Sequence, residues 1–393
     1  MYRIGQEEKD AVARVIDTRD LFKINGGMHE TEQCEALMRE IFGVKRSLLM
    51  TSGLSALASA LIGLGIGPGD EVIVPAYTYI ATAMAVVQAG AIPVIADIND
   101  TLTLDPAAAE KKITPRTRCI IPVHIQGFPC DMDGILALAK RHGIAVVEDA
   151  CQADGGSYKG RYLGTLGDVG AYSFNYYKVI TAGEGGLLVT NDRAVYERAL
   201  IYHDASAVAF FGDQLEDVAQ PVFGGTEFRV SDITGAILRA QLRRLPELIA
   251  DLRRCRDALL DALDARLRVI PSHDPQGGCP TTLALRFDTA ETCRAFAARC
   301  GEQGLSLTIP IDTGKHIYTN WTQIMEKRGA LHPAMDPFRM AENQGLQTDY
   351  TRDMCPETLS LLSRTAYVAV DPDWSADAVA QTAQILNNAA AHL

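Results

Sequence analysis

The sequence predicts an α/β protein with a large, mostly parallel sheet and a smaller C-terminal α+β domain. From about residue 47 to residue 190, short runs rich in β-branched residues alternate with stretches of helical length. Most of these runs lack the apolar–polar alternation of a half-exposed sheet, as expected for strands covered on both faces. After Asp232 the alternation ends, and a long helical region leads into a few shorter strands.

The first part is expected to supply one continuous sheet. We predict strands at residues 47–51, 71–75, 92–97, 119–123, 145–149, 170–174 and 186–190. Helices are expected between them at residues 53–64, 77–89 and 131–142, the last with Asp131 at its N-cap. Repeated strand–helix–strand order produces a parallel sheet, and such sheets bind ligands at the carboxyl ends of their strands.

The second part is expected to connect and close the fold. Residues 233–267 form an amphipathic helical region, and we interpret its arginines as a solvated face rather than an anion site. Strands are expected at residues 281–287, 306–309 and 366–370, and a closing helix at residues 375–388. We therefore place a large domain at residues 1–250 and a small C-terminal domain at residues 251–393.

Composition narrows the classes of function. The 393 residues carry a formal net charge of −12, which disfavours nucleic-acid and membrane surfaces because both require a basic face. The nine cysteines are scattered and odd in number, which favours a reducing compartment. The eight histidines show no metal-ligand spacing, and neither a signal segment nor a membrane span is apparent. We expect a soluble cytoplasmic protein without a metal.

Two residues suggest the chemistry. Asp149 ends a predicted buried strand, and Lys178 follows 29 residues later, just after another predicted strand. Both should therefore project at the ligand-binding edge of the sheet. Pyridoxal phosphate (PLP) requires this pair, because a lysine amine forms an imine with its aldehyde and a carboxylate keeps its ring nitrogen protonated. Either residue alone would be read as structural.

The motifs around this pair extend over much of the chain, and together they resemble the sugar aminotransferases of the DegT/StrS group. The resemblance is strong over residues 35–260 and implies fold type I of the PLP-dependent enzymes, which is aspartate aminotransferase-like, with a large PLP-binding domain. The matching motifs are Thr51-Ser52-Gly53, Gly67-Pro68-Gly69-Asp70, Glu148-Asp149-Ala150-Cys151-Gln152, Ser173-Phe174, Lys178, Gly183-Glu184-Gly185-Gly186 and Arg229-Val230-Ser231-Asp232.

The resemblance implies a role for each matching residue. Lys178 would form the internal aldimine, a Schiff base with PLP, and would then move the proton between substrate and cofactor. Asp149 would pair with the ring nitrogen, and both residues are named as catalytic. Gln152 would bind the ring hydroxyl, and Tyr79 would stack on the ring. The phosphate-side residues would be Ser52, Gly53, Leu54 and Ser173.

One position departs from the family pattern. The family commonly has Asn-x-Arg before Ser-Asp, with the Asn reaching the partner subunit's cofactor phosphate, whereas this chain has Glu227-Phe228-Arg229. An ionised Glu would repel the phosphate. We therefore expect Glu227 to turn away, for example to pair with Arg229.

The resemblance also implies the substrates and the assembly. The acceptor would be a keto or aldehyde sugar, a cyclitol or a sugar acid, the donor glutamate or glutamine, and the protein a homodimer. Within the family, the sequence is most similar to aminotransferases that form the amino derivative of the octulosonic acid Kdo. Candidate substrate contacts are Arg229, His316 and Tyr318. A PLP- or PMP-dependent sugar dehydratase and a non-catalytic PLP-binding regulator remain alternatives.

Overall fold

The computed structural model describes residues 3–24, 27–205, 208 and 218–393, and it is built around one seven-stranded sheet. The spatial order of the strands is β1-β9-β8-β5-β4-β2-β3. Only β9 runs against its neighbours, so the predicted mostly parallel sheet is confirmed. The strands are β1 (Arg46–Met50), β2 (Glu71–Pro75), β3 (Ile92–Ala96), β4 (Thr117–Ile120), β5 (Ala145–Asp149), β8 (Val169–Ser173) and β9 (Gly186–Thr190).

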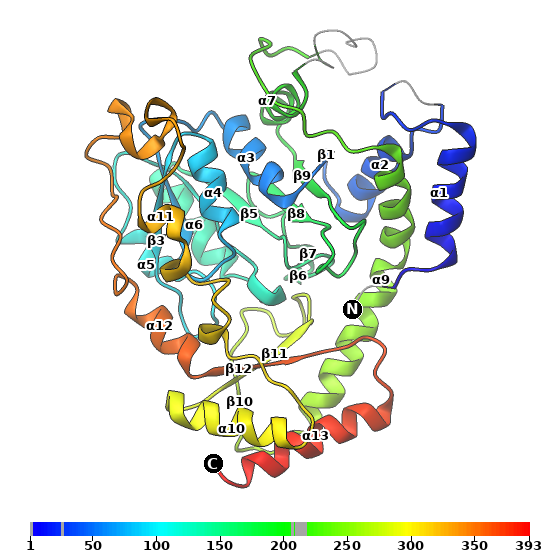
Figure 1. Ribbon diagram of the computed structural model, residues 1–393, viewed down its shortest axis with the longest axis vertical. Helices are drawn as coiled ribbons and strands as arrows, with labels where there is room; N and C mark the ends of the chain where they lie inside the picture. The colour runs from blue at the N-terminus through cyan, green and yellow to red at the C-terminus, as the bar shows by residue number, and fades with distance from the viewer. Residues whose placement is uncertain (1–2, 25–26, 206–207, 209–217) are drawn as a thin grey trace.

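Helices cover both faces of this sheet (Figure 1). One face packs against α3 (Gly53–Gly63), α4 (Ala81–Gln88) and α7 (Arg193–His203). The other face packs against α2 (Glu30–Phe42), α5 (Pro106–Glu110), α6 (Met132–His142) and α9 (Asp232–Asp261). Strand β5 serves both layers, since Val146 lies in the core on the α6 side and Val147 in the core on the α3 side. This double burial explains why the strands read as unbroken apolar runs.

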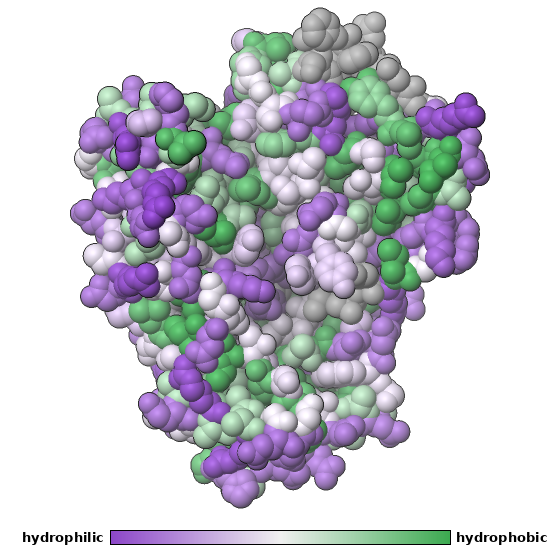
Figure 2. Space-filling view, viewed as in Figure 1, coloured by the Kyte–Doolittle hydropathy of each residue, from purple (hydrophilic) through white to green (hydrophobic). Residues whose placement is uncertain are grey.

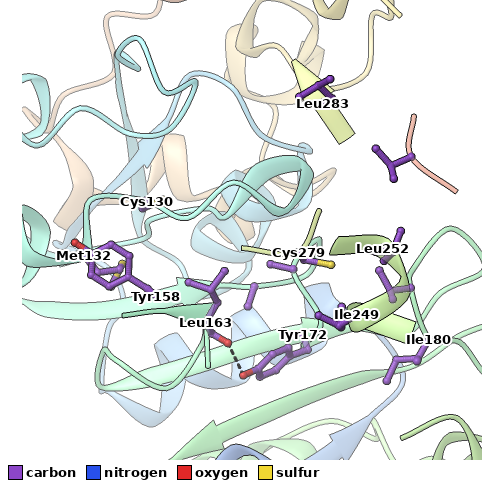
Figure 3. Packing of buried hydrophobic residues seen from close by; sticks show 14 of the residues in the cluster. Cys130, Met132, Tyr158, Leu163, Tyr172, Ile180, Ile249, Leu252, Cys279 and Leu283 are labelled. Carbon is purple, nitrogen blue, oxygen red and sulfur yellow. Dashed lines mark hydrogen bonds between the residues drawn. The ribbon is translucent and has the colours of Figure 1, made fainter. Parts of the chain in front are cut away.

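The core on the α6 side extends from the sheet into α9 and the smaller sheet (Figure 3). Tyr172 is fully buried on β8, and its hydroxyl donates to the carbonyl of Leu163 at 2.6 Å. A short hairpin of β6 (Ser157–Tyr158) and β7 (Arg161–Tyr162) precedes β8 and was not anticipated. The predicted Asp131 cap of α6 is confirmed, because its side chain accepts from the Gly134 amide.

The smaller sheet lies below the large one in Figure 1. It has the order β10-β11-β12 and is antiparallel. Its elements, with the helices beside them, are β10 (Arg268–Val269), β11 (Thr282–Arg286), β12 (Thr365–Ala369), α10 (Ala290–Glu302) and α13 (Ala376–Ala390). The strand expected at residues 306–309 is wrong, because only Thr308 makes an isolated bridge, to Tyr367.

The chain returns to the large sheet before it reaches β12. Short turns and helices connect α10 to α12 (Pro356–Ser363), among them α11 (Thr322–Met325). Within this stretch, Gln347 bonds to the buried carboxylate of Glu71 on β2. Part of the stretch at residues 317–355 therefore packs against the large sheet, and residue 250, where we place the domain boundary, lies within α9.

One further helix, α1 (Gln6–Thr18), packs on the N-terminal half of α9. Figure 2 shows an apolar patch over these helices, whereas polar side chains dominate the rest of that face. In α1 and the turn before it, Ile16 and Ile4 are 56% and 59% exposed. Among the described residues, no helix combines the length and apolar character needed to cross a membrane.

Candidate active site

Asp149 lies at the carboxyl end of β5 and is buried, with 4% of its surface exposed. Its Oδ2 accepts a hydrogen bond from the Thr82 hydroxyl at 2.7 Å. Its Oδ1 accepts from the backbone amide of Cys151 at 3.1 Å. Two donors from different elements fix the orientation of this buried carboxyl. The residue therefore presents a fixed carboxyl group at the edge where the sequence predicts the cofactor.

Lys178 lies in the turn that reverses the chain from β8 to β9. Its amide donates to the carbonyl of Asn175 at 3.0 Å, and the Asn175 side chain accepts from the Tyr177 amide at 3.0 Å. On the far side of the turn, the Thr181 hydroxyl donates to the Phe174 carbonyl at 2.9 Å. Hydrogen bonds at both ends thus hold the segment that carries the lysine, whose side chain is half-buried.

His316 and Tyr79 gather near Lys178. The rings of Tyr79 and His316 lie 5.8 Å apart between centroids. Burial lowers the pKa of His316 to about 4, and the positive charges of Lys178 and Lys315 contribute. This imidazole is therefore neutral near pH 7. Tyr79 is 52% exposed, so its ring is available to a ligand.

The turn before α3 lies against the same edge. Ser52 caps the helix, since its hydroxyl accepts from the Ser55 amide at 3.1 Å. A Cβ at Gly53 would lie 2.7 Å from Sγ of Cys151 and 3.0 Å from Cβ of Ser173, so only glycine fits there. Ser52 also forms a bridge with Gly185. The predicted phosphate turn, the end of β5 and the end of β8 are therefore adjacent.

This turn offers donors for an anion. Within the described residues, no acceptor is recorded for the amides of Gly53 and Leu54, which open the 11-residue helix α3. The Ser173 hydroxyl beside them is 7% exposed and also has no recorded partner in that part of the chain. Amides at a helix N-terminus together with a hydroxyl form a suitable phosphate cradle.

Gln152 follows the same strand. Its Oε1 accepts a hydrogen bond from the backbone amide of Gln126 at 3.0 Å, which fixes the orientation of the Gln152 side chain. The NH2 group of Gln152 remains as the donor, which is what an oxygen on the cofactor ring requires. The residues present therefore fit PLP: an amine for its aldehyde, a carboxylate for its ring nitrogen, donors for its phosphate and an exposed aromatic ring for its face.

Two predicted substrate contacts do not join this group. Tyr318 is fully buried; its hydroxyl donates to the Arg352 carbonyl at 2.6 Å and accepts from the Cys355 amide at 3.3 Å. Those bonds assign it a structural role. Arg229 contacts Asp204 through an ion pair, and its guanidinium lies over the ring of Phe22, 5.1 Å from the centroid.

Glu227 turns toward Arg229, as predicted. Its Oε2 lies 2.5 Å from Nη2 of Arg229, and its Oε1 accepts from the Arg229 backbone amide at 3.2 Å. The pairing is confirmed, and it explains how a glutamate is tolerated where the family commonly has asparagine. The carboxylate is neutralised by its neighbour instead of facing a phosphate.

Two residues near the site were missed from the sequence. Thr82, on α4, donates to Asp149, and its spacing of four from Thr78 was the only available signal. Asp154 is 1% exposed, and neither of its oxygens has a recorded partner among the described residues. Burial raises the pKa of Asp154 well above its usual value, and Lys178 opposes this shift.

Comparison with known proteins assigns the family. The sequence profile of the DegT/DnrJ/EryC1/StrS aminotransferase family matches residues 3–313. The chain belongs to this family. GDP-perosamine synthase of Caulobacter vibrioides is 41% identical over 250 residues, covering 63% of this chain and 65% of that protein. The match thus spans slightly less than two thirds of that relative's length.

Two solved structures share the whole fold of this chain. An aminotransferase from Psychrobacter cryohalolentis has a TM-score of 0.82 at 28% identity, covering 99% of this chain and 98% of that one. DesV of S. venezuelae has a TM-score of 0.78 at 28% identity, covering 98% and 94%. The predictions of a type I PLP-dependent fold and of PLP as the cofactor are confirmed by this membership.

Proposed function

We propose that this protein is a PLP-dependent aminotransferase that moves an amino group from glutamate or glutamine to the carbonyl carbon of a sugar, cyclitol or sugar acid. The observation that carries the proposal is that the Gly53 turn adjoins Cys151 at the end of β5, where the charges of both Asp149 and Lys178 act on the Cys151 thiol. Membership in an aminotransferase family supports the reaction class.

Each residue would make a separate contribution. The bound cofactor supplies an electron-withdrawing ring that stabilises negative charge on the reacting carbon. Asp149, fixed by its two donors, would keep the ring nitrogen protonated. The Lys178 amine would hold the cofactor aldehyde and, once released, would carry the proton that leaves the donor and reaches the product. The Gly53 and Leu54 amides, with the Ser173 hydroxyl, would anchor the phosphate.

His316 would contact the substrate from the side of Tyr79. Its lowered pKa of about 4 leaves the ring neutral, so it can both donate and accept a hydrogen bond with sugar hydroxyls or a carbonyl. The C-terminal segment that carries it packs on the large domain and so brings residues of both parts of the chain to one site.

The acceptor is a carbonyl sugar of one of two kinds. The relative named GDP-perosamine synthase supports a nucleotide-linked keto sugar. The likeness to aminotransferases of the Kdo type supports a free keto sugar acid. An aminotransferase is favoured over a dehydratase because Lys178 is present where the dehydrating relatives typically have histidine.

The protein would act as a homodimer in the cytoplasm. An apolar groove along α1, lined by Ile4, Val12, Ile16 and Ile237, supports burial against a second copy. The segment Gly224–Asp232 would be the part of each subunit that approaches the site of its partner. Size-exclusion chromatography with light scattering checks the assembly, and a fully active monomer would contradict it.

The reaction is tested by incubating the PLP-loaded protein with both kinds of acceptor and with glutamate or glutamine. We expect an amino sugar and the matching 2-oxo acid in equal amounts, and no turnover by Lys178→Ala. The variant should still bind PLP. Deoxygenation of the sugar without consumption of the amino donor would indicate the dehydratase instead, and wild-type turnover by Lys178→Ala would refute the catalytic assignment.

A further inference from the structure

A chain of buried hydroxyls ends on Asp149. The Thr82 hydroxyl lies 2.7 Å from Oδ2 of Asp149 and 2.8 Å from the hydroxyl of Thr78. The two threonines are 0% and 1% exposed. They lie four residues apart, with Thr82 in the first turn of α4 and Thr78 in the segment that leads into it. The hydroxyls of Thr78 and Thr82 and the carboxyl of Asp149 therefore form a continuous, buried chain of hydrogen bonds.

The line has a fixed direction. An ionised carboxylate only accepts hydrogen bonds, so the Thr82 hydroxyl must donate to Asp149. Its oxygen is then available to accept from Thr78, whose hydroxyl supplies the hydrogen. Donation from Thr78 polarises the Thr82 hydroxyl and strengthens its bond to the carboxylate. Because threonine is stiff at χ1, the packed helix also holds this hydroxyl in place.

The two oxygens of Asp149 have unlike partners. Oδ1 is held by a backbone amide, which no substitution at Cys151 other than proline removes. Oδ2 is held by a side chain and depends on the residue at position 82. The orientation of this carboxylate is thus set partly by Thr82, a residue on another element.

We propose that Thr82, supported by Thr78, is a positioning residue that holds the Asp149 carboxylate aimed at the ring nitrogen of PLP. The inference rests on the proposed function for the role of the ring nitrogen, but the contact between Thr82 and Asp149 does not. Without the hydroxyl, the buried carboxylate keeps only the Cys151 amide of these two donors, and its Oδ2 is no longer held in place.

Three variants test the inference. Thr82→Val has nearly the same shape without the hydroxyl, Thr82→Ser keeps the hydroxyl, and Thr78→Val removes only the second member of the line. Thermal melting checks that each variant folds. The first readout needs no PLP. It is the NMR chemical shift of the Asp149 13Cγ carbon, which is assigned as the carboxyl signal that disappears in Asp149→Asn. We expect a clear displacement in Thr82→Val, a smaller one in Thr78→Val, and almost none in Thr82→Ser.

The second readout uses PLP labelled with 15N at the ring. We expect Thr82→Val to shift the nitrogen signal toward the unprotonated form and to weaken PLP binding by about tenfold, the loss expected for a hydrogen bond to a charged group. Thr82→Ser should resemble the wild type. An unchanged Asp149 shift and an unchanged nitrogen signal in Thr82→Val would overturn the inference. If the Asp149 shift changes in Thr82→Val but the wild-type protein binds no PLP, the positioning inference stands and the proposed function alone is refuted.

Discussion

Strand β5 ends in two adjacent buried carboxylates whose surroundings differ. Glu148 faces the α6 side, where it accepts from His124 at 3.0 Å and from three backbone amides of the loop at residues 164–167. Asp149 faces the α4 side, where the Thr82 hydroxyl and the Cys151 backbone amide donate to it. Neighbouring residues on a strand point to opposite faces, so one carboxylate fastens a loop while the other faces the cofactor edge.

The difference shows how one strand serves two purposes. Glu148 has four hydrogen-bond partners, one of them Nε2 of His124, whose Nδ1 accepts from the Cys130 backbone amide. That charge is satisfied entirely by the fold. Asp149 has fewer donors and can still bind a cationic partner. Removing each carboxylate should therefore have opposite consequences for stability and catalysis.

The largest effect is expected for Asp149→Asn. The amide no longer keeps the cofactor ring nitrogen protonated, so the rate of amino transfer should fall by orders of magnitude while the protein still folds. Single-turnover kinetics with the amino donor and thermal melting measure the two quantities separately. A rate within a few-fold of wild type would show that Asp149 is not the partner of the ring.

Glu148→Gln should have the opposite pattern, a loss of stability with little change in the rate of amino transfer. The new NH2 group faces backbone donors, leaving buried amides without an acceptor, so the free energy of unfolding should fall by about 3 kcal/mol or more. Urea unfolding measures the loss. The rate per folded molecule should stay close to wild type, and a selective loss of rate in a stable protein would contradict the division between the two faces.

Asp154 is a third buried carboxyl, and among the residues that the structure describes no donor contacts either of its oxygens. Because burial raises its pKa, the folded protein keeps a proton that the unfolded chain releases above about pH 4. Asp154 therefore makes stability fall as pH rises above that value. Asp154→Asn cannot lose this proton, so its stability relative to wild type should increase from about pH 5 to about pH 8. Urea unfolding at both pH values measures the difference in free energy of unfolding between Asp154→Asn and wild type. The same difference at about pH 5 and about pH 8 would count against a raised pKa of Asp154.

The smallest effect is expected for Glu227→Asn. Glu227 is half-exposed and already paired with Arg229, a kind of contact worth about 0–1 kcal/mol. Its replacement should leave PLP affinity unchanged or slightly increase it, since asparagine can donate to a phosphate. Titration of the apo-protein with PLP measures this. A clear loss of affinity would mean that Glu227 supports the cofactor.

The features that could be predicted from the sequence are those set by residues close together in the chain. All seven strands of the large sheet were located from sequence, because strands buried on both faces are nearly continuous apolar runs. The spacing between Asp149 and Lys178, with the glycine at position 53, was sufficient to predict the edge at which they meet. These features depend on residues close in the chain and on a general rule about parallel sheets.

The features of the site that could not be predicted depend on contacts between segments far apart in the sequence. Thr82 reaches Asp149 because the tertiary fold brings the first turn of α4 to the carboxyl end of β5, which no local pattern encodes. His316 and Tyr318 were predicted together, yet His316 contacts Tyr79 whereas Tyr318 enters a 3₁₀ turn and points into the core. Short turns of this kind lack the periodicity from which a side chain's direction can be predicted.

The central claim is that Lys178 carries the cofactor opposite Asp149. The most direct test is borohydride reduction of the PLP-loaded protein, followed by mass spectrometry of its peptides. We predict a loss of the yellow absorbance and a single pyridoxyl group on Lys178, with none in Lys178→Ala treated in the same way. A pyridoxyl group on another lysine, or a protein that remains colourless and unlabelled with added PLP, would contradict the account.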